Sequence, residues 1–260
     1  MTDATVRALA EAGCLHPEEE AAILTDAAPT AEALRALVAR RAAGEPLEHV
    51  VGWAEFRGLR LAVAPGVFVP RPRSDLLVDE AASLVRCLSD PEGAAVVVDL
   101  CCGTGAIGAA LATELPQVRL HAADIDPRAV ACARTNLAPV GGAVHQGDLF
   151  DALPKRLRGK VDVLVASPPY VPTDEIRLLA SEARRFEPQV ALDGGAEGVG
   201  LVERIARGAR RWLSRGGSLA LEVAGSQITR VSFLLEDLGY APRAVTSDDG
   251  AAAVTARLLR

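Results

Sequence analysis

The spacing of apolar residues changes twice along the chain. Up to about residue 43, apolar side chains recur at three- and four-residue intervals, as at Leu34, Leu37 and Val38, which predicts two or three short helices. Between residues 47 and 70 the apolar residues fall into short β-like runs, and Gly58 between two of these runs predicts a hairpin. From about residue 94 onward, apolar runs of strand length alternate with helical patterns. This alternation predicts an α/β fold with a doubly wound, mostly parallel sheet.

The α/β part begins with Val96–Leu100, a continuous apolar run of the kind that forms strands buried on both faces of a parallel sheet. Further strands are predicted over residues 118–123, 143–146, 161–166, 218–223, 241–245 and 252–258. Helices are predicted over residues 106–114, 127–137, 199–212 and 228–238. We therefore expect a seven-stranded sheet whose βαβ crossovers are right-handed.

Prolines and glycines divide the part of the chain that precedes this sheet. Pro17 and Pro29 stand at the predicted starts of two helices, and residues 49–51, 55–57 and 59–63 are predicted as short strands. Ser74 ends a proline-stiffened connector and is a good N-cap, which predicts a helix from there through Val85. We therefore expect an N-terminal helical domain over residues 1–46, a β-hairpin and Pro-rich linker over 47–75, and the α/β domain over 76–260.

Composition and charge narrow the classes of partner. The 260 residues are 50% hydrophobic and 24% charged, the net charge is −6 and the pI is about 5.4. Proteins that bind nucleic acid mainly by neutralising phosphates carry a basic face, so this balance disfavours direct nucleic-acid binding without excluding a local basic patch. The five cysteines include no C-x-x-C pair, which predicts reduced thiols and a cytoplasmic location. Neither a signal peptide nor an 18-residue apolar stretch occurs, so we expect no membrane insertion.

A glycine-rich loop, D-L-C-C-G-T-G, follows the first strand of the α/β part and opens a helix. Its glycines allow a nucleotide-like ligand to approach the backbone at a helix N-terminus. The strict dinucleotide pattern is not met, because a cysteine occupies the first glycine position. An acid at the end of the strand is unhelpful beneath a pyrophosphate but stabilises an amino or sulfonium group, which favours S-adenosylmethionine over a dinucleotide. The expected cofactor contacts in this loop are Asp99, Cys101, Gly103, Thr104 and Gly105.

Two further acids stand at the ends of the next two strands. Asp124 follows the second strand, about 20 residues after the loop, where a carboxylate can hold ribose hydroxyls. Asp148, in G-D-L-F, ends the third strand, where it can accept a hydrogen bond from an adenine amino group. The carboxyl ends of parallel strands meet at the edge where open α/β folds bind ligands. We therefore expect the cofactor there, with Ile125 and Leu149 also in contact.

The fourth strand ends at the same edge in a rigid corner, Ser167-Pro168-Pro169-Tyr170. Proline has no N–H, and Pro169 restricts Pro168 to extended geometry, which fixes the direction of the Pro168 carbonyl. Methyl transfer to a planar amide or conjugated amine requires the nitrogen lone pair to be aimed at the methyl group, and acceptors around the N–H groups can hold it so. We therefore interpret the corner as a clamp made by the Pro168 carbonyl and the Ser167 side chain, with Tyr170 stacked on the acceptor.

With these residues the chain resembles the class I S-adenosylmethionine-dependent methyltransferases, and in particular the protein glutamine N5-methyltransferases that modify peptide release factors. The similarity runs from about residue 30 to the end of the chain. Besides the loop, the acids, G-D-L-F and the corner, it is carried by G-E-P-L-E-H-V-V-G from Gly44, E-F-R-G-L from Glu55, F-V-P-R-P-R-S-D from Phe68, D-I-D-P from Asp124, E-P-Q-V-A-L-D-G-G-A-E-G from Glu187 and G-G-S-L-A-L-E-V from Gly216. The resemblance implies a Rossmann-like catalytic domain, an N-terminal domain for substrate recognition, and a release factor as partner.

Three positions depart from the pattern of that family. The family corner usually begins with Asn, whose amide contacts the substrate amide, whereas Ser167 is shorter and cannot make the same two-ended contact. The family loop usually has Gly at the position of Cys101. The connector ends in Pro72-Arg73-Ser74-Asp75, where the family has a sequence like Pro-Glu-Thr-Glu.

The serine at the start of the corner leaves methyl acceptors other than a glutamine amide possible. The expected substrate contacts are Phe68, Arg71, Arg73, Tyr170 and Glu187, and the two arginines can hold a carboxylate, which suits a free amino acid with an amide or guanidinium nitrogen, such as arginine. A nucleic-acid base methyltransferase is disfavoured by the acidic pI, and a non-enzymatic cofactor binder by the intact Pro-Pro-Tyr. No cluster of His, Cys and Asp has metal spacing, so we expect no metal. His49 and His145 are expected to be isolated, and His16 and His121 are no better candidates for ligands.

Overall fold

The computed structural model describes residues 2–88 and 94–259. The first elements are α1 (Thr2–Glu11), α2 (Pro17–Ala27), α3 (Ala31–Ala42), α4 (Leu47–Val51), β1 (Trp53–Phe56), β2 (Leu59–Ala62) and α5 (Asp75–Arg86). They are followed by β3 (Val96–Leu100), α6 (Ala106–Glu114), β4 (Arg119–Asp124), α7 (Pro127–Leu137), β5 (Ala143–Gln146), β6 (Val161–Ala166), α8 (Ser181–Phe186), α9 (Gly200–Ala209), β7 (Leu213–Glu222), α10 (Ile228–Asp237), β8 (Tyr240–Thr246) and β9 (Ala252–Leu258).

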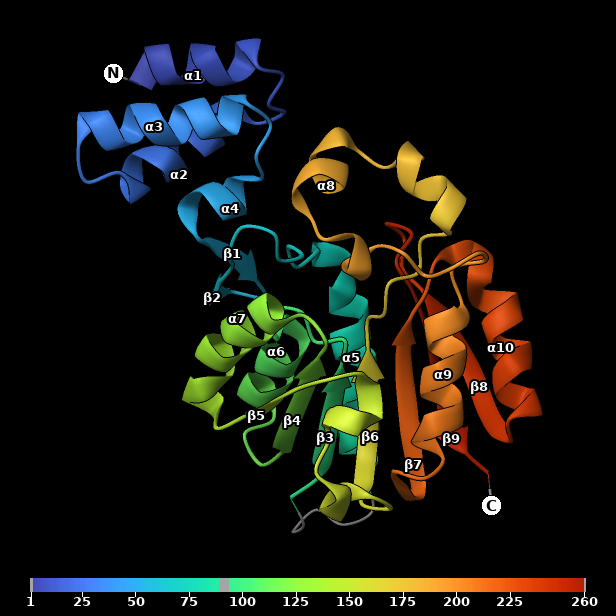
Figure 1. Ribbon diagram of the computed structural model, residues 1–260. Helices are drawn as coiled ribbons and strands as arrows, with labels where there is room; N and C mark the ends of the chain where they lie inside the picture. The colour runs from blue at the N-terminus through green and yellow to red at the C-terminus, as the bar shows by residue number, and fades with distance from the viewer. Residues whose placement is uncertain (1, 89–93, 260) are drawn as a thin grey trace.

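A seven-stranded sheet has the order β5-β4-β3-β6-β7-β9-β8, which confirms the predicted α/β fold (Figure 1). The strands from β5 to β7 pair in parallel, and β9 runs antiparallel to both β7 and β8. The strand order reverses between β3 and β6. At such a switch point the connections leave in opposite directions and open a crevice at the carboxyl ends of the strands.

The unbroken apolar run of β3 follows from burial on both faces of the sheet. Val98 and Leu100 pack into a core with residues of α9 and α10, and Val97 packs into a second core with residues of α5, α6 and α7. Successive side chains of a strand point to opposite faces, so a strand that is covered on both sides needs apolar residues at consecutive positions.

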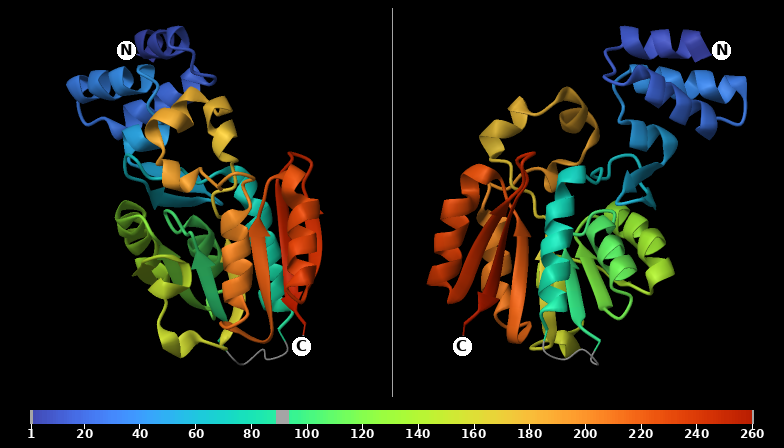
Figure 2. Two further views of the ribbon diagram at one scale, coloured as in Figure 1. Left: turned by 45° about the vertical axis from the view of Figure 1, so that its right-hand side comes forward. Right: turned by 180° about the vertical axis from the view of Figure 1, so that it is seen from behind.

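The N-terminal helices form a separate cluster around Leu9, Leu24 and Leu34. The Thr30 side chain caps α3 by accepting a hydrogen bond from the Ala33 N–H at 3.1 Å. This cluster lies beyond the carboxyl edge of the sheet, and the segment of residues 173–191, which contains α8, lies over the same edge (Figures 1 and 2). We call residues 173–191 the cap segment.

Contacts join the N-terminal helices to the cap segment. The guanidinium of Arg41 lies 3.6 Å from the Glu182 carboxylate, and Arg185 donates a hydrogen bond to the Ala43 carbonyl at 3.5 Å. The helices therefore touch the part of the chain that covers the carboxyl edge of the sheet. None of the helices in the described ranges is both long enough and apolar enough to cross a membrane.

Three local predictions were wrong. Residues 49–51 belong to α4 rather than to a strand, because the short helix is bounded by Pro46 and by Gly52 with φ 82°. Ser74 does not cap α5, since its hydroxyl donates to the Glu222 carboxylate at 2.8 Å instead. The rings of His121 and His145 are stacked with centroids 5.4 Å apart, so these histidines are not isolated. The predicted hairpin is confirmed as β1 and β2.

Candidate active site

A cavity of about 730 Å³ lies at the carboxyl edge of the sheet, at the switch point between β3 and β6. Its walls come from residues that follow β3, β4, β5 and β6, from the end of β7, from the connector before α5, and from the cap segment. This volume lies in the usual range for pockets that hold a cofactor or a small ligand. The predicted site residues that line it are Phe68, Arg71, Arg73, Cys101, Gly103, Asp124, Ile125, Asp148, Leu149, Ser167, Pro168, Pro169, Tyr170 and Glu187.

The glycine loop bends under the end of β4 and fixes the carboxylate of Asp124. The Gly103 N–H donates to Asp124 Oδ2 at 2.8 Å, and the Asp126 N–H donates to Oδ1 at 2.9 Å. Burial raises the pKa of the Asp124 carboxyl, and these N–H groups lower it. No described atom lies within 4 Å of the position that a β-carbon on Gly103 would take, so a ligand can approach the backbone there.

Cys101 adopts a backbone conformation that favours glycine. Its φ is 56°, in the left-handed region, which costs a residue with a side chain about 1–2 kcal/mol. The glycine that is usual in the resembling family would carry no such strain. The Cys101 side chain also occupies part of the cavity wall, so this position shapes the cavity beside the loop.

Three expected cofactor contacts do not line the cavity: Asp99, Thr104 and Gly105. Asp99 has no exposed surface, and its Oδ2 accepts a hydrogen bond from the Gly108 N–H of α6 at 3.0 Å. Burial raises the pKa of Asp99 to about 7. The expectation that this acid faces a cationic cofactor is therefore corrected: its side chain lies beneath the loop and ties it to α6.

The other two residues of the loop also have structural contacts. The Thr104 carbonyl accepts a hydrogen bond from the Asn136 amide at 2.9 Å. A β-carbon at Gly105, where φ is 78°, would lie 3.1 Å from the Leu137 side chain, so glycine allows the loop to pack against α7.

The wall beyond β4 and β5 combines apolar and charged groups. Ile125 is 52% exposed although it is a large apolar residue, and it faces the cavity with Leu149. Asp148 accepts from Arg204 at 2.7 Å through its Oδ2 atom. Arg204 also lines the cavity and was not predicted as a site residue.

The corner after β6 presents two free acceptors to the cavity. Within residues 2–88 and 94–259, neither the Ser167 hydroxyl nor the Pro168 carbonyl has a hydrogen-bond partner, although both residues line the cavity. The carbonyl of Tyr170, two residues further on, accepts from Gln227 Nε2 at 2.8 Å. The corner is thus anchored on one side and leaves its acceptors available on the other.

Tyr170 is held by a charged network that also contains Glu222. Arg73 donates to the Tyr170 hydroxyl, and its guanidinium lies 5.5 Å from the centre of the Tyr170 ring. Arg73 Nε lies 3.7 Å from Glu222 Oε1, and the Ser74 hydroxyl donates to Glu222 Oε2. Burial, and then the charge of Glu222, raises the pKa of the Tyr170 phenol, so the hydroxyl stays protonated.

Glu222 was missed as a site residue. Its side chain is 7% exposed and lines the cavity at the end of β7. The available signal was the same as for Asp124, namely an acid that ends an apolar strand at the ligand-binding edge.

The second arginine of the connector is also paired. Arg71 forms an ion pair with Glu187, and its guanidinium lies 4.8 Å from the centre of the Phe68 ring. Glu187 is buried and accepts from the Val69 N–H at 3.4 Å. Burial raises the pKa of Glu187, and the charge of Arg71 lowers it. Glu187 therefore ties the cap segment to the connector beside the cavity.

The chain matches known proteins over most of its length. A model of the family described as "Methyltransferase small domain" matches residues 58–184. A release factor glutamine methyltransferase of Streptomyces coelicolor is 42% identical over 209 residues, which cover 80% of this chain and 73% of the relative. A 4-amino-L-phenylalanine/4-methylamino-L-phenylalanine methyltransferase of Streptomyces pristinaespiralis is 38% identical over 217 residues, covering 82% of this chain and 74% of the relative.

The fold also matches a solved structure. A methyltransferase from Pyrococcus furiosus superimposes with a TM-score of 0.57 and 17% sequence identity, covering 78% of this chain and 91% of that protein. At this level of identity the likeness shows the fold alone.

Proposed function

Because the chain belongs to the release factor glutamine methyltransferase family, we propose that it transfers a methyl group from S-adenosylmethionine to the side-chain amide nitrogen of a glutamine in a peptide release factor. The observation that carries the proposal is the pair of unpartnered acceptors, the Ser167 hydroxyl and the Pro168 carbonyl, on the wall of a 730 Å³ cavity. Such hydrogen-bond acceptors suit a substrate whose methyl-accepting nitrogen carries N–H donors and must be held in a fixed orientation.

The residues of the cavity fit S-adenosylmethionine as the methyl donor. When bound, this cofactor supplies an electrophilic methyl group on a positively charged sulfur. The Asp124 carboxylate accepts from two N–H groups and retains lone pairs for ribose hydroxyls, and the exposed face of Ile125 suits a planar base. Asp148 binds Arg204 through Oδ2, so its Oδ1 atom is left to accept from an amino group.

The corner residues would orient the acceptor nitrogen. Pro169 fixes the Pro168 carbonyl, which accepts one N–H of the amide, and the Ser167 hydroxyl supplies the second polar contact. The Tyr170 and Phe68 rings can lie against the planar amide group, and Arg73 and Arg71 hold these rings in position. With the nitrogen lone pair directed at the methyl group, no general base has to act before the transfer.

The N-terminal helices are proposed as the part that recognises the release factor. Their contacts with the cap segment, between Arg41 and Glu182 and between Arg185 and Ala43, join them to a wall of the cavity. This organisation supports the division into a recognition domain over residues 1–46, a linker over 47–75 and a catalytic domain over 76–260. A cytoplasmic location is proposed with it, since all five cysteines are free thiols.

A free amino acid is the second candidate for the methyl acceptor, and three observations favour it. Ser167 is shorter than the Asn that is usual at this corner, and a relative with 38% identity is named for methylation of 4-amino-L-phenylalanine. Arg71 and Arg73 line the cavity with side chains that are 35% and 50% exposed, so they retain N–H donors for a carboxylate.

A methyl-transfer assay with labelled cofactor tests the proposal. The protein is incubated in parallel with a release factor and with a panel of free amino acids that includes glutamine, arginine and 4-amino-L-phenylalanine. Label on a glutamine of the release factor supports the first candidate, and Ser167→Asn should then retain or raise the rate. Label on a free amino acid alone refutes it in favour of the second. Absence of label on any acceptor, with cofactor bound in calorimetry, contradicts both.

A further inference from the structure

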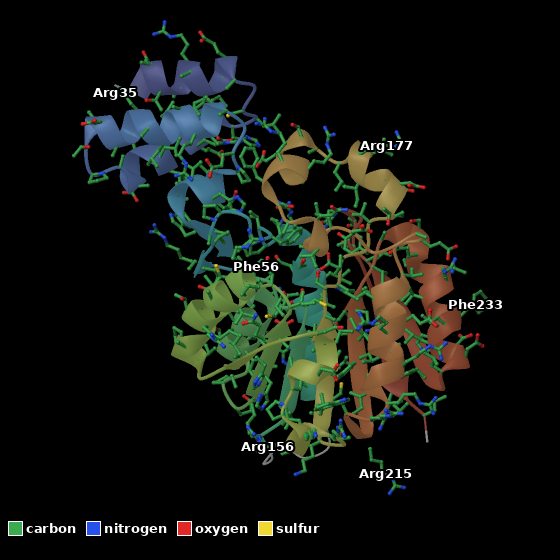
Figure 3. All side chains as sticks on the ribbon, viewed as in Figure 1. Arg35, Phe56, Arg156, Arg177, Arg215 and Phe233 are labelled. Atoms are coloured by element: carbon green, nitrogen blue, oxygen red, sulfur yellow. The ribbon has the colours of Figure 1, made fainter. Side chains whose placement is uncertain are left out.

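A cationic surface lies at the edge of the sheet opposite the cavity, at the amino ends of β6 and β7. It is formed by Lys155, Arg156, Arg158, Lys160, Arg211 and Arg215, which we call the basal cationic surface. All six residues are exposed, and the two lysines are the only lysines of the whole sequence. Arg156 and Arg215 lie at this end of the molecule, far from Arg177 on the cap segment (Figure 3).

Backbone contacts make this surface continuous. The Gly159 N–H donates to the Arg211 carbonyl at 3.2 Å, and the Val161 N–H donates to the Trp212 carbonyl at 3.0 Å. The guanidinium of Arg158 lies 5.4 Å from the centre of the Trp212 ring. The residues before β6 therefore lie directly against those before β7.

The charges of these six residues are unpaired within residues 2–88 and 94–259. In the described part of the chain none of them forms an ion pair, whereas arginines elsewhere on the surface, such as Arg86, Arg230 and Arg243, each pair with a glutamate. Asp162, the second residue of β6, accepts from the Val96 N–H and from the Ser214 hydroxyl. In a chain of net charge −6, this edge concentrates positive charge that forms no ion pair among the described residues and that a polyanion would neutralise.

Two planar rings lie near one of these cations, Arg156. His121 on β4 and His145 on the edge strand β5 stack with Nδ1 of His121 3.1 Å from Nε2 of His145. Burial lowers the pKa of both imidazoles, and the charge of nearby Arg156 lowers them further, so both rings are neutral at pH 7. Exposed guanidinium groups match phosphates in a bidentate geometry, and aromatic rings accept stacked bases.

We propose that the basal cationic surface binds single-stranded RNA. The phosphates would contact the arginines and lysines, and a base could stack beside the imidazole pair. The site lies at the opposite edge of the sheet from the cavity, so this activity does not depend on the proposed methyl transfer. The acidic overall charge disfavoured nucleic-acid binding in the sequence, but the structure gathers on one edge cations that the net charge conceals.

Fluorescence anisotropy of the full-length protein with a labelled uridine oligonucleotide tests this. Binding should weaken as salt rises, because each neutralised phosphate of a single strand contributes a slope of about 0.7 in a plot of log affinity against log salt. The variant Arg156→Glu/Arg158→Glu/Arg215→Glu should bind on the order of 10-fold or more weakly, and its slope should fall by about 2. Its methyl-transfer rate should equal that of the wild type.

The matched control carries the same charge change at the other end of the molecule. Arg7, Arg35 and Arg177 are also exposed and form no ion pair with any described residue, and their reversal to Glu should leave RNA affinity unchanged. Equal losses in the two triple variants, or no salt-dependent RNA binding by the wild type, would overturn the proposal. So would binding to anionic phospholipid vesicles or to an acidic polypeptide in the absence of RNA binding.

Discussion

Replacement of Gly198 by alanine should displace the catalytic corner. Gly198 has φ 70°, and a β-carbon there would lie 2.2 Å from the Tyr170 carbonyl oxygen and 2.4 Å from Gln227 Nε2. Because β-carbons essentially never approach such atoms within 3.0 Å, the carbonyl must move by about 0.8 Å, the difference between 3.0 and 2.2 Å. The same displacement disrupts the 2.8 Å hydrogen bond from Gln227 to this carbonyl.

A shift of this size moves the acceptors that are proposed to hold the substrate nitrogen. Misplacement of reacting groups by about 1 Å costs on the order of 100-fold in rate, so kcat for methyl transfer should fall by about that factor. The affinity for the cofactor should be nearly unchanged, since Asp124 is held by N–H groups of the loops that follow β3 and β4. Single-turnover methyl transfer and calorimetric titration of the cofactor measure the two quantities.

Gly195→Ala is the matched control in the same loop. Gly195 has φ 87°, but no described atom lies within 4 Å of its β-carbon position, so alanine adds backbone strain without a clash. The strain of a left-handed residue, about 1–2 kcal/mol, should appear in the urea unfolding of both variants. Only Gly198→Ala should lose kcat. Equal kcat in the two variants would refute the inference that the position of the Ser167–Tyr170 corner controls methyl transfer.

Three further predictions concern acids that line the cavity or lie beneath its glycine loop. Asp124→Ala should weaken cofactor binding on the order of 10- to 100-fold, because charge-assisted hydrogen bonds contribute about 1.5–3 kcal/mol, and unchanged affinity in calorimetry would remove Asp124 from the cofactor site. Glu222→Gln should raise KM for the acceptor on the order of 10-fold through loss of the charge that holds Arg73, with cofactor affinity retained; an unaltered KM contradicts this role. Asp99 titrates near pH 7 when folded and near 3.8 when unfolded, so the folded state binds the extra proton and stability falls as pH rises through this interval. In the wild type this should lower the free energy of unfolding by about 2–3 kcal/mol between pH 5 and 8, and Asp99→Asn should abolish that loss in urea unfolding. An unchanged pH profile in the variant would contradict the assignment of the titration to Asp99.

Most of the fold could be predicted because local patterns decide it. The apolar run of β3 and the helix starts at Pro17 and Pro127 need no information from distant residues. The errors arose where distant residues compete. Ser74 has the chemistry of an N-cap, but its hydroxyl donates a hydrogen bond to Glu222, 148 positions away. No local pattern contains such a partner.

The site could be predicted only to the level of strand ends, because the sequence does not show how deep each acid lies in the sheet: Asp99 pairs with Ala122, two residues short of Asp124. Asp124 is the last residue of β4 and reaches the cavity, whereas Asp99 is the last but one of β3 and points to Gly108 of α6. Both acids follow apolar runs and look equivalent in the sequence. The depth of each side chain in the sheet separates them, and that depth depends on how α6 packs.

The rigidity of the corner comes from a second segment as well as from its prolines. Val171 forms a bridge with Asp193, and the Gly194 N–H donates to the Val171 carbonyl at 2.8 Å. A β-carbon at Gly194 would lie 2.7 Å from the Pro169 carbonyl, so the two backbones pack too closely for any other residue without a shift. The A-L-D-G-G stretch, which carries much of the family resemblance, therefore serves as a support for the corner. Because this support holds the backbone, we expect the change from Asn to Ser at position 167 to alter one proposed substrate contact and to leave the carbonyl of Pro168 in place. Methyl transfer would then be retained while the methyl-accepting substrate can differ.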